Sequence, residues 1–150
     1  MNSYPVDVRH LGRRQLPQGI LIDTGAGVTI ADGPNHFPEF KIEPSVASRA
    51  GQTYMGPRQE VIHNRGEVKT RLRLGAPEGT AVGMKFQDAK VRRPILSVGE
   101  STEVDNSFWF DNQGSFILPK GCPETIAIRK LVQQARQKLA MTKELSLIHI

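Results

Sequence analysis

The sequence predicts a mostly-β domain followed by one helix. Short runs of β-branched and aromatic residues, bounded by Gly, Pro, Asn or Asp, recur roughly every 8 to 12 residues up to position 119, as in all-β barrels and sandwiches. Apolar and charged residues alternate over positions 67–74, which is typical of a half-exposed strand. A Gly-free stretch with apolar residues at helical spacing begins at Pro123.

The first strands lead to a candidate site. Residues 1–18 form a polar lead-in with at most a weak edge strand near Val6. An apolar run bounded by Gly follows and predicts a buried strand over residues 20–22, which delivers Asp23 to a turn. We expect a second strand over residues 28–30 and a Pro-containing loop over residues 32–44.

Two hairpins and a second apolar run complete the β domain, which we assign to residues 19–119. The first hairpin spans residues 52–62 with Gly56 and Pro57 in its turn, and the second spans residues 107–118. Between them we expect a strand at 67–74, a turn at 75–79, a strand pair within 81–91 and a buried run at 94–98.

The C-terminal part has a different character. Residues 120–144 carry six Lys or Arg and two Glu, and we predict an amphipathic helix over 123–143. A solvated helix face is the favoured interpretation of these charges, and weak nucleic-acid binding is the alternative. Residues 145–150 match the translation of a common sequencing adapter, so we expect them to be an artefact.

Composition excludes several classes of protein. The chain has 150 residues, enough for one domain with its own core. No apolar stretch approaches the roughly 20 residues that a membrane-spanning helix requires, and no signal peptide is apparent, so we expect an intracellular protein. The single cysteine, Cys122, fits a reducing compartment. We predict neither a metal nor a cofactor, because the four histidines, His10, His36, His63 and His149, lack ligand spacing.

The segment with definite chemistry is the turn Asp23-Thr24-Gly25-Ala26. An apolar strand would place the Asp23 carboxylate in a low-dielectric centre, and Gly25 lets the backbone approach the reacting atoms closely. The Thr24 hydroxyl can hydrogen-bond backbone across an interface, and Ala26 leaves room beside it. An ordinary turn, in which Asp23 caps its own backbone, is the structural alternative.

These residues resemble the retropepsin-like aspartic proteases of retroviruses and retrotransposons, and most of all those of the copia type. The resemblance covers roughly residues 18–118: the Asp-Thr-Gly-Ala turn, a central flap-like hairpin, and the second apolar run Ile95-Leu96-Ser97-Val98 followed by Phe108-Trp109-Phe110-Asp111. It implies an all-β, closed acid-protease barrel with a flap hairpin. It also implies a homodimer, because the family needs two catalytic aspartates and this chain has one such motif.

The resemblance also implies site residues. Asp23 would be the catalytic residue and Thr24, Gly25 and Ala26 its turn. Polypeptide substrate would contact Gly27, Met55, Gly56, Pro57, Ile95, Leu96 and Ser97. Three features depart from the retroviral pattern: Gly27 replaces an Asp, Ser97 replaces a Gly, and the flap turn holds one Gly followed by Pro57.

Two functions from different classes follow. The first is an aspartic endopeptidase, cut from or embedded in a retroelement-like polyprotein. The second is a catalytically inactive retropepsin-like domain that dimerises or binds peptides. The intact Asp23-Thr24-Gly25-Ala26 turn favours the first.

Overall fold

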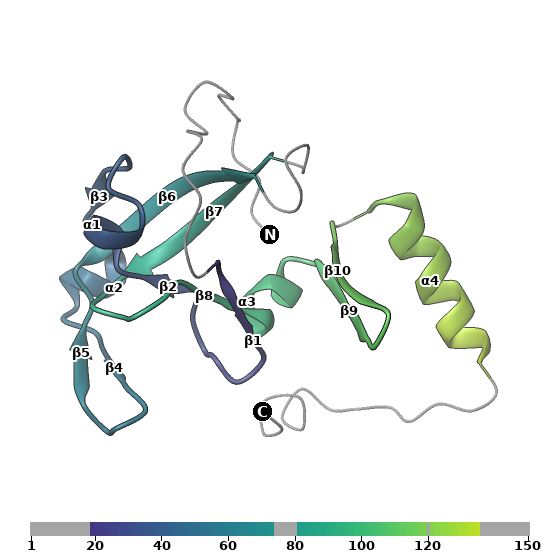
Figure 1. Ribbon diagram of the computed structural model, residues 1–150, viewed down its shortest axis with the longest axis horizontal. Helices are drawn as coiled ribbons and strands as arrows, with labels where there is room; N and C mark the ends of the chain where they lie inside the picture. The colour runs from purple at the N-terminus through teal and green to yellow at the C-terminus, as the bar shows by residue number, and fades with distance from the viewer. Residues whose placement is uncertain (1–18, 74–80, 120, 136–150) are drawn as a thin grey trace.

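The computed structural model describes residues 19–73, 81–119 and 121–135. The expected edge strand near Val6, the turn at 75–79 and the end of the C-terminal helix beyond position 135 lie outside the described residues. Within the described ranges the chain is mostly β, with three helices of four to six residues and one longer C-terminal helix, so the predicted fold class is confirmed at this level (Figure 1).

Six strands form one sheet. In spatial order they are β1 (Leu21–Asp23), β8 (Ile95–Ser97), β2 (Ile30–Ala31), β7 (Ala81–Asp88), β6 (Gly66–Arg73) and β3 (Ile42–Glu43). β1 runs parallel to β8, and β2 runs parallel to β7, whereas β6 and β7 are antiparallel. The pairing recorded for the described strands leaves the sheet open, with β1 and β3 as its outer strands.

The core lies against the long β6–β7 ribbon. Val68 and Thr70 on β6 and Met84 and Phe86 on β7 are buried at alternate positions, as a period of two requires. Phe37 packs on Phe86 with ring centroids 5.0 Å apart. Ala31 on β2 and Leu96 on β8 complete the buried cluster. The strand that follows the Asp23 turn and the strand that pairs with β1 are therefore both anchored in this core.

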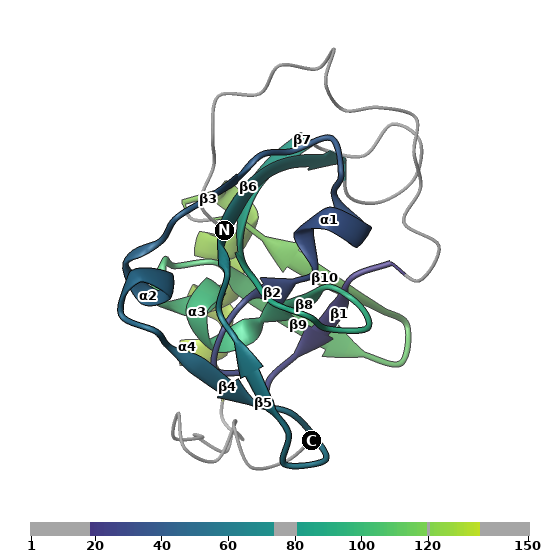
Figure 2. The same ribbon diagram turned by 90° about the vertical axis from the view of Figure 1, so that its left-hand side faces the viewer.

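Two hairpins lie outside the sheet. The first pairs β4 (Thr53–Met55) with β5 (Val61–His63), and the second pairs β9 (Ser107–Asp111) with β10 (Gly114–Leu118). Both were predicted from the turn residues. The β4–β5 hairpin and the loop from β1 to β2 project toward the same end of the molecule in Figures 1 and 2.

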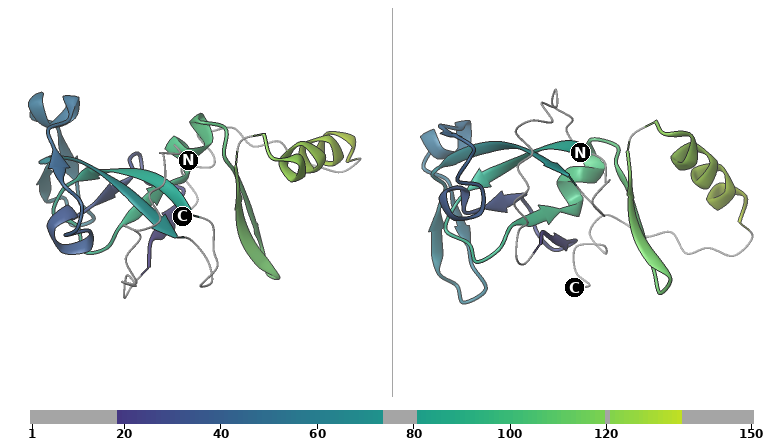
Figure 3. Two further views of the ribbon diagram at one scale, coloured as in Figure 1. Left: turned by 90° about the horizontal axis from the view of Figure 1, so that it is seen from above. Right: turned by 45° about the horizontal axis from the view of Figure 1, so that its top comes forward.

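Four helices are described: α1 (Gly33–His36), α2 (Val46–Arg49), α3 (Val98–Glu103) and α4 (Pro123–Gln134). Their starts follow local rules, because Ser45 and Ser97 cap α2 and α3 by accepting from backbone N–H groups, and α4 begins with Pro123. Figure 3 shows β9, β10 and α4 at one end of the molecule, beyond the six-stranded sheet.

Several local predictions were wrong. The segment 32–44 contains α1 and β3 as well as loop, the second strand lies at residues 30–31 rather than 28–30, and residues 81–88 form one strand instead of a pair. The helix at Pro123 ends at Gln134. The strand before Asp23 is not fully buried: Ile22 is 37% exposed, because β1 is an outer strand among the described ones and pairs there only with β8.

Candidate functional site

Asp23 ends β1 beside the end of β8. The parallel register pairs Asp23 with Ser97, so the two apolar runs of the sequence meet at the candidate site. The carboxylate is partly buried, and its Oδ1 accepts a hydrogen bond from the Gly25 N–H at 2.7 Å. No ion pair joins Asp23 to a Lys or Arg in the described part of the chain. The carboxylate is therefore oriented by its own turn and is not neutralised by a described cation.

Ser97 is hydrogen-bonded to the segment that follows Asp23. Its hydroxyl donates to the Ala26 carbonyl at 2.6 Å, and its backbone N–H donates to the Thr29 hydroxyl at 3.1 Å. The same hydroxyl oxygen accepts the Glu100 N–H and so caps α3. A glycine at position 97 could form neither side-chain bond, so the serine holds both the turn and the helix start in place.

The predicted substrate-contact residues on β8 are partly or fully buried. Ser97 is fully buried and Leu96 is 3% exposed, the latter packed in the core cluster. Their side chains are packed or hydrogen-bonded within the chain, and their contact with substrate stays a prediction. Ile95 is partly buried, and Gly27 is exposed with open space where a Cβ would lie.

The Thr24 hydroxyl is unusual because it is buried and finds no hydrogen-bond partner among the described residues. A hydroxyl without a partner costs roughly 1–3 kcal/mol when water is excluded. Thr24 lies directly after β1, an outer strand of the described sheet.

The β4–β5 hairpin carries the other predicted contact residues. Met55 is 71% exposed at the end of β4, and the turn closes through Gly56 N–H to the Glu60 carbonyl at 2.9 Å. Gly56 itself is buried beneath the Glu60 side chain, and a Cβ at position 56 would collide with the Glu60 carboxylate. Gly56 therefore fits a tight turn. The mobility of this hairpin remains a prediction.

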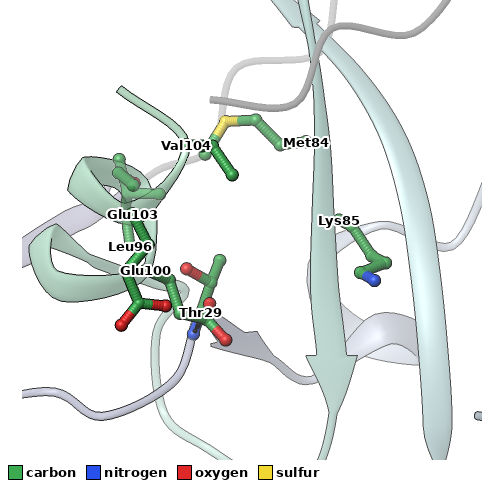
Figure 4. Close-up of a pocket in the computed structure, with 8 residues that line it drawn as sticks. Thr29, Met84, Lys85, Leu96, Glu100, Glu103 and Val104 are labelled. Atoms are coloured by element: carbon green, nitrogen blue, oxygen red, sulfur yellow. Dashed lines mark hydrogen bonds between the residues drawn. The ribbon is translucent and has the colours of Figure 1, made fainter. Parts of the chain in front are cut away.

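A small cavity lies behind the turn, between β7, β8 and α3 (Figure 4). Its volume is about 230 Å³, and it is lined by Thr29, Met84, Lys85, Leu96, Glu100, Ser101, Glu103 and Val104. Glu100 Oε2 accepts the Thr29 N–H at 2.8 Å, whereas the Lys85 side chain points away toward Glu67. Neither Asp23 nor its turn lines this cavity, which is smaller than a typical small-ligand pocket of roughly 300–1,000 Å³.

One polar cluster was missed at the level of sequence. Asp32 and Asp88 directly follow or end buried strands, are 4% and 0% exposed, and share the guanidinium of Arg65. Burial raises the pKa of Asp32, but hydrogen bonds from Asn35 and Arg65 outweigh this effect and hold its pKa below the ordinary value. The available signal was a carboxylate at each of two apolar strand ends, because a buried carboxylate requires a cation or hydrogen-bond donors as partners; Arg65, whose side chain is 41% exposed, is that cation here.

The described residues show no metal-binding arrangement and no membrane span. No three His, Cys, Asp or Glu side chains converge in the described ranges, and none of the described helices is long and apolar enough to cross a bilayer. Comparison with known proteins gives no relative: no family model, no curated protein and no solved structure matches the chain.

Proposed function

We propose that this chain is an aspartic endopeptidase of the retropepsin type that is active as a homodimer. The observation that carries the proposal is the state of Asp23, a strand-end carboxylate that is accessible, oriented by Gly25 N–H, and free of any described cation. A group in this state can accept and release a proton next to a bound peptide. The proposed substrate is a polypeptide, and the source is a retroelement-like polyprotein.

The second carboxylate would come from a second copy of the chain. Three features of the edge near Asp23 support this: β1 has no described strand on its outer side, Ile22 on β1 is 37% exposed, and the Thr24 hydroxyl has no described partner. A twofold axis beside β1 would place two Asp23 residues together and let each Thr24 bond to the other copy. In this proposal the open sheet of one chain is its part of the closed, retropepsin-like barrel.

The chemistry follows from two like charges held close together. Such carboxylates cannot both ionise, and they share one proton, as in aspartic-protease dyads generally. The ionised Asp23 takes a proton from water as the water oxygen bonds to the peptide carbonyl carbon. The protonated Asp23 gives its proton to the carbonyl oxygen. The Asp23 that took the water proton then gives it to the amide nitrogen, the other Asp23 takes a proton from a hydroxyl of the tetrahedral intermediate, and the C–N bond breaks to give an acid and an amine with one proton left on the dyad. Activity would show a bell-shaped dependence on pH, because only the one-proton dyad works.

The decisive experiment is cleavage of a peptide library by the purified chain between pH 4 and 7, with Asp23→Asn as the control. Cleavage by the wild type and none by the variant is the expected result. Retention of peptides without cleavage would instead support the inactive, peptide-binding alternative. A wild type and a variant that cleave equally would point to a contaminating protease and would remove the basis of the proposal.

The homodimer is tested by concentration and by mixing. Specific activity should fall on dilution, and added Asp23→Asn protein should inhibit the wild type through mixed dimers. Thr24→Val keeps the side-chain shape, removes the hydroxyl, and should weaken dimerisation by roughly 1–3 kcal/mol in sedimentation equilibrium. Activity that is independent of concentration, with a monomer in sedimentation and no inhibition by the variant, would contradict a shared site.

A further inference from the structure

The base of the β4–β5 hairpin is fixed by two consecutive residues, Asn64 and Arg65, which follow β5. The Asn64 amide donates to the Tyr54 hydroxyl at 2.7 Å and to Gln87 Oε1 at 2.9 Å, and its Oδ1 accepts the Gly66 N–H at 2.8 Å. Asn64 therefore joins the inner side of the hairpin to β7 and to the first residue of β6 with all three bonds of its side chain.

Arg65 makes the second attachment. Its Nη2 donates to Asp32 Oδ1 and Asp88 Oδ1, each at 2.9 Å, and its backbone N–H donates to the Asp88 carbonyl at 2.8 Å. The Gly33 N–H also donates to Asp88 Oδ1 at 2.7 Å. We call Asn64 and Arg65, with their partners Tyr54, Gln87, Asp32 and Asp88, the hairpin clasp. It ties the hairpin base to the ends of β2 and β7.

The outer part of the hairpin is held differently. The β4–β5 ladder has three residue pairs, and Met55 and Val61 at its far end are 71% and 59% exposed. The hydrogen bonds of the turn stay within it, from Gly56 N–H to the Glu60 carbonyl and from Arg58 N–H to Glu60 Oε2. The base of the hairpin is therefore attached to the sheet, whereas its tip is exposed and bonded only within its own turn.

Hydrogen bonds also connect the clasp to the segment around the Asp23 turn. Gln87, which accepts from Asn64, donates its own N–H to the Thr29 carbonyl at 2.9 Å. The Thr29 hydroxyl accepts the N–H of Ser97, the residue paired with Asp23. On the hairpin side, burial raises the pKa of Tyr54, the hydrogen bond from Asn64 opposes this rise, and the negative charge of Glu100 adds to it. Glu100 accepts the Thr29 N–H.

We propose that Asn64 and Arg65 are positioning residues. They fix the position of the β4–β5 hairpin relative to the Asp23 turn, and this position controls substrate binding. The inference rests on the proposed peptidase function. The two residues touch neither Asp23 nor the hairpin tip in the described hydrogen bonds. They act through Tyr54 and Gln87 on one side and through Asp32 and Asp88 on the other.

Two mild substitutions test the clasp in the full chain. Tyr54→Phe removes one hydroxyl that accepts from Asn64, and Arg65→Lys keeps the charge but loses the planar guanidinium that bridges two carboxylates. Thr53→Val, on the exposed face of the same strand, and Arg49→Lys, on the exposed helix α2, are the matched controls. Neither control side chain has a recorded bond to the clasp.

The first readout is amide hydrogen exchange, which needs no catalytic activity. We expect the amides of residues 53–55 and 61–63 to exchange about tenfold faster in Arg65→Lys and about threefold faster in Tyr54→Phe, with residues 95–97 unchanged. Both controls should match the wild type. Hairpin exchange that is unchanged in both clasp variants would overturn the proposal, and so would equal acceleration in residues 95–97, which would indicate global destabilisation.

The second readout is steady-state kinetics on a cleaved peptide. A misplaced hairpin should raise KM several-fold while kcat changes less than about twofold, whereas simple loss of folded enzyme lowers kcat and leaves KM unchanged. A fall in kcat alone would therefore overturn the positioning role. If the wild type cleaves no peptide, the peptidase proposal fails by itself, and the exchange experiment still decides whether the clasp holds the hairpin.

Discussion

Asp23 and Asp88 both end a strand of the same sheet, but their surroundings differ. Asp23 lies on the outermost strand, is partly exposed, and has one backbone donor from its own turn. Asp88 lies on β7 inside the sheet, is 0% exposed, and is bound by the Arg65 guanidinium and the Gly33 N–H. The position of a strand in the sheet thus decides whether its terminal carboxylate is available for chemistry or used to hold the fold.

The two regions also differ in how their polar groups are bonded. Around Asp88, Oδ1 accepts from Arg65 and from the Gly33 N–H, although Asp88 Oδ2 has no described partner, and removing Arg65 would leave two buried carboxylates without their cation. Around Asp23, the Thr24 hydroxyl has no described partner, and in the proposed homodimer a second copy would supply one. Changes near Asp88 should therefore act on the stability of the single chain, and under the proposed function changes near Asp23 should act on association and catalysis.

The largest effect on stability is expected from Gly66→Ala on the Asp88 side. Gly66 pairs with Asp88, has φ of +143°, and a Cβ there would collide with the Glu43 backbone carbonyl. Strain of roughly 1–3 kcal/mol from the backbone alone, plus the collision, should appear in urea unfolding. Gly27→Ala on the Asp23 side is the control, because its Cβ would meet open space. An equal decrease in the free energy of unfolding for both variants would contradict the proposed difference between the two regions.

A smaller loss of stability is expected at acidic pH. Because the folded-state pKa of Asp32 lies below its ordinary value, the stabilisation from this group is complete above that ordinary value, near 3.9, and is lost as the pH falls through the folded-state pKa. The free energy of unfolding should decline over that range, and Asp32→Asn should reduce the slope.

The acid experiment needs one further control. The His36 ring lies beside Asp32 and accepts its backbone N–H at 3.0 Å, so the titration is repeated in a His36→Gln background. The slope assigned to Asp32 should persist there. A slope that depends on His36 and is unchanged by Asp32→Asn would show that the carboxylate near Arg65 does not control acid stability.

The smallest effect is expected from removal of the C-terminal helix, far from both carboxylates. In α4 the side chains of Ile126, Leu131 and Val132 are 61%, 66% and 46% exposed, and Thr125 is the one buried residue of the helix. Truncation after Lys120 should leave a cooperatively folding β domain within roughly 1 kcal/mol of the full chain. Loss of the unfolding transition in circular dichroism would show that α4 belongs to the folding unit.

The sequence by itself determined the local parts of this protein. Alternation over residues 67–74 predicted β6, turn residues predicted both hairpins, and Pro123 predicted the start of α4, because strand period, turn chemistry and helix initiation depend on neighbouring residues. The short elements α1, β3, α2 and α3 were missed, because segments of two to six residues carry too little periodicity. The Asp-Thr-Gly-Ala turn identified Asp23 as the candidate site for the same local reason.

Only the tertiary structure decided which distant residues meet. It placed Ser97 beside Asp23, buried Leu96 and Ser97 within the chain, and left Ile22 partly exposed at the edge of the described sheet. It also brought Arg65 to Asp32 and Asp88 from three separate segments. Strand order determines these contacts, and it depends on how the whole chain buries its apolar surface and pairs its buried charges, which no local pattern contains.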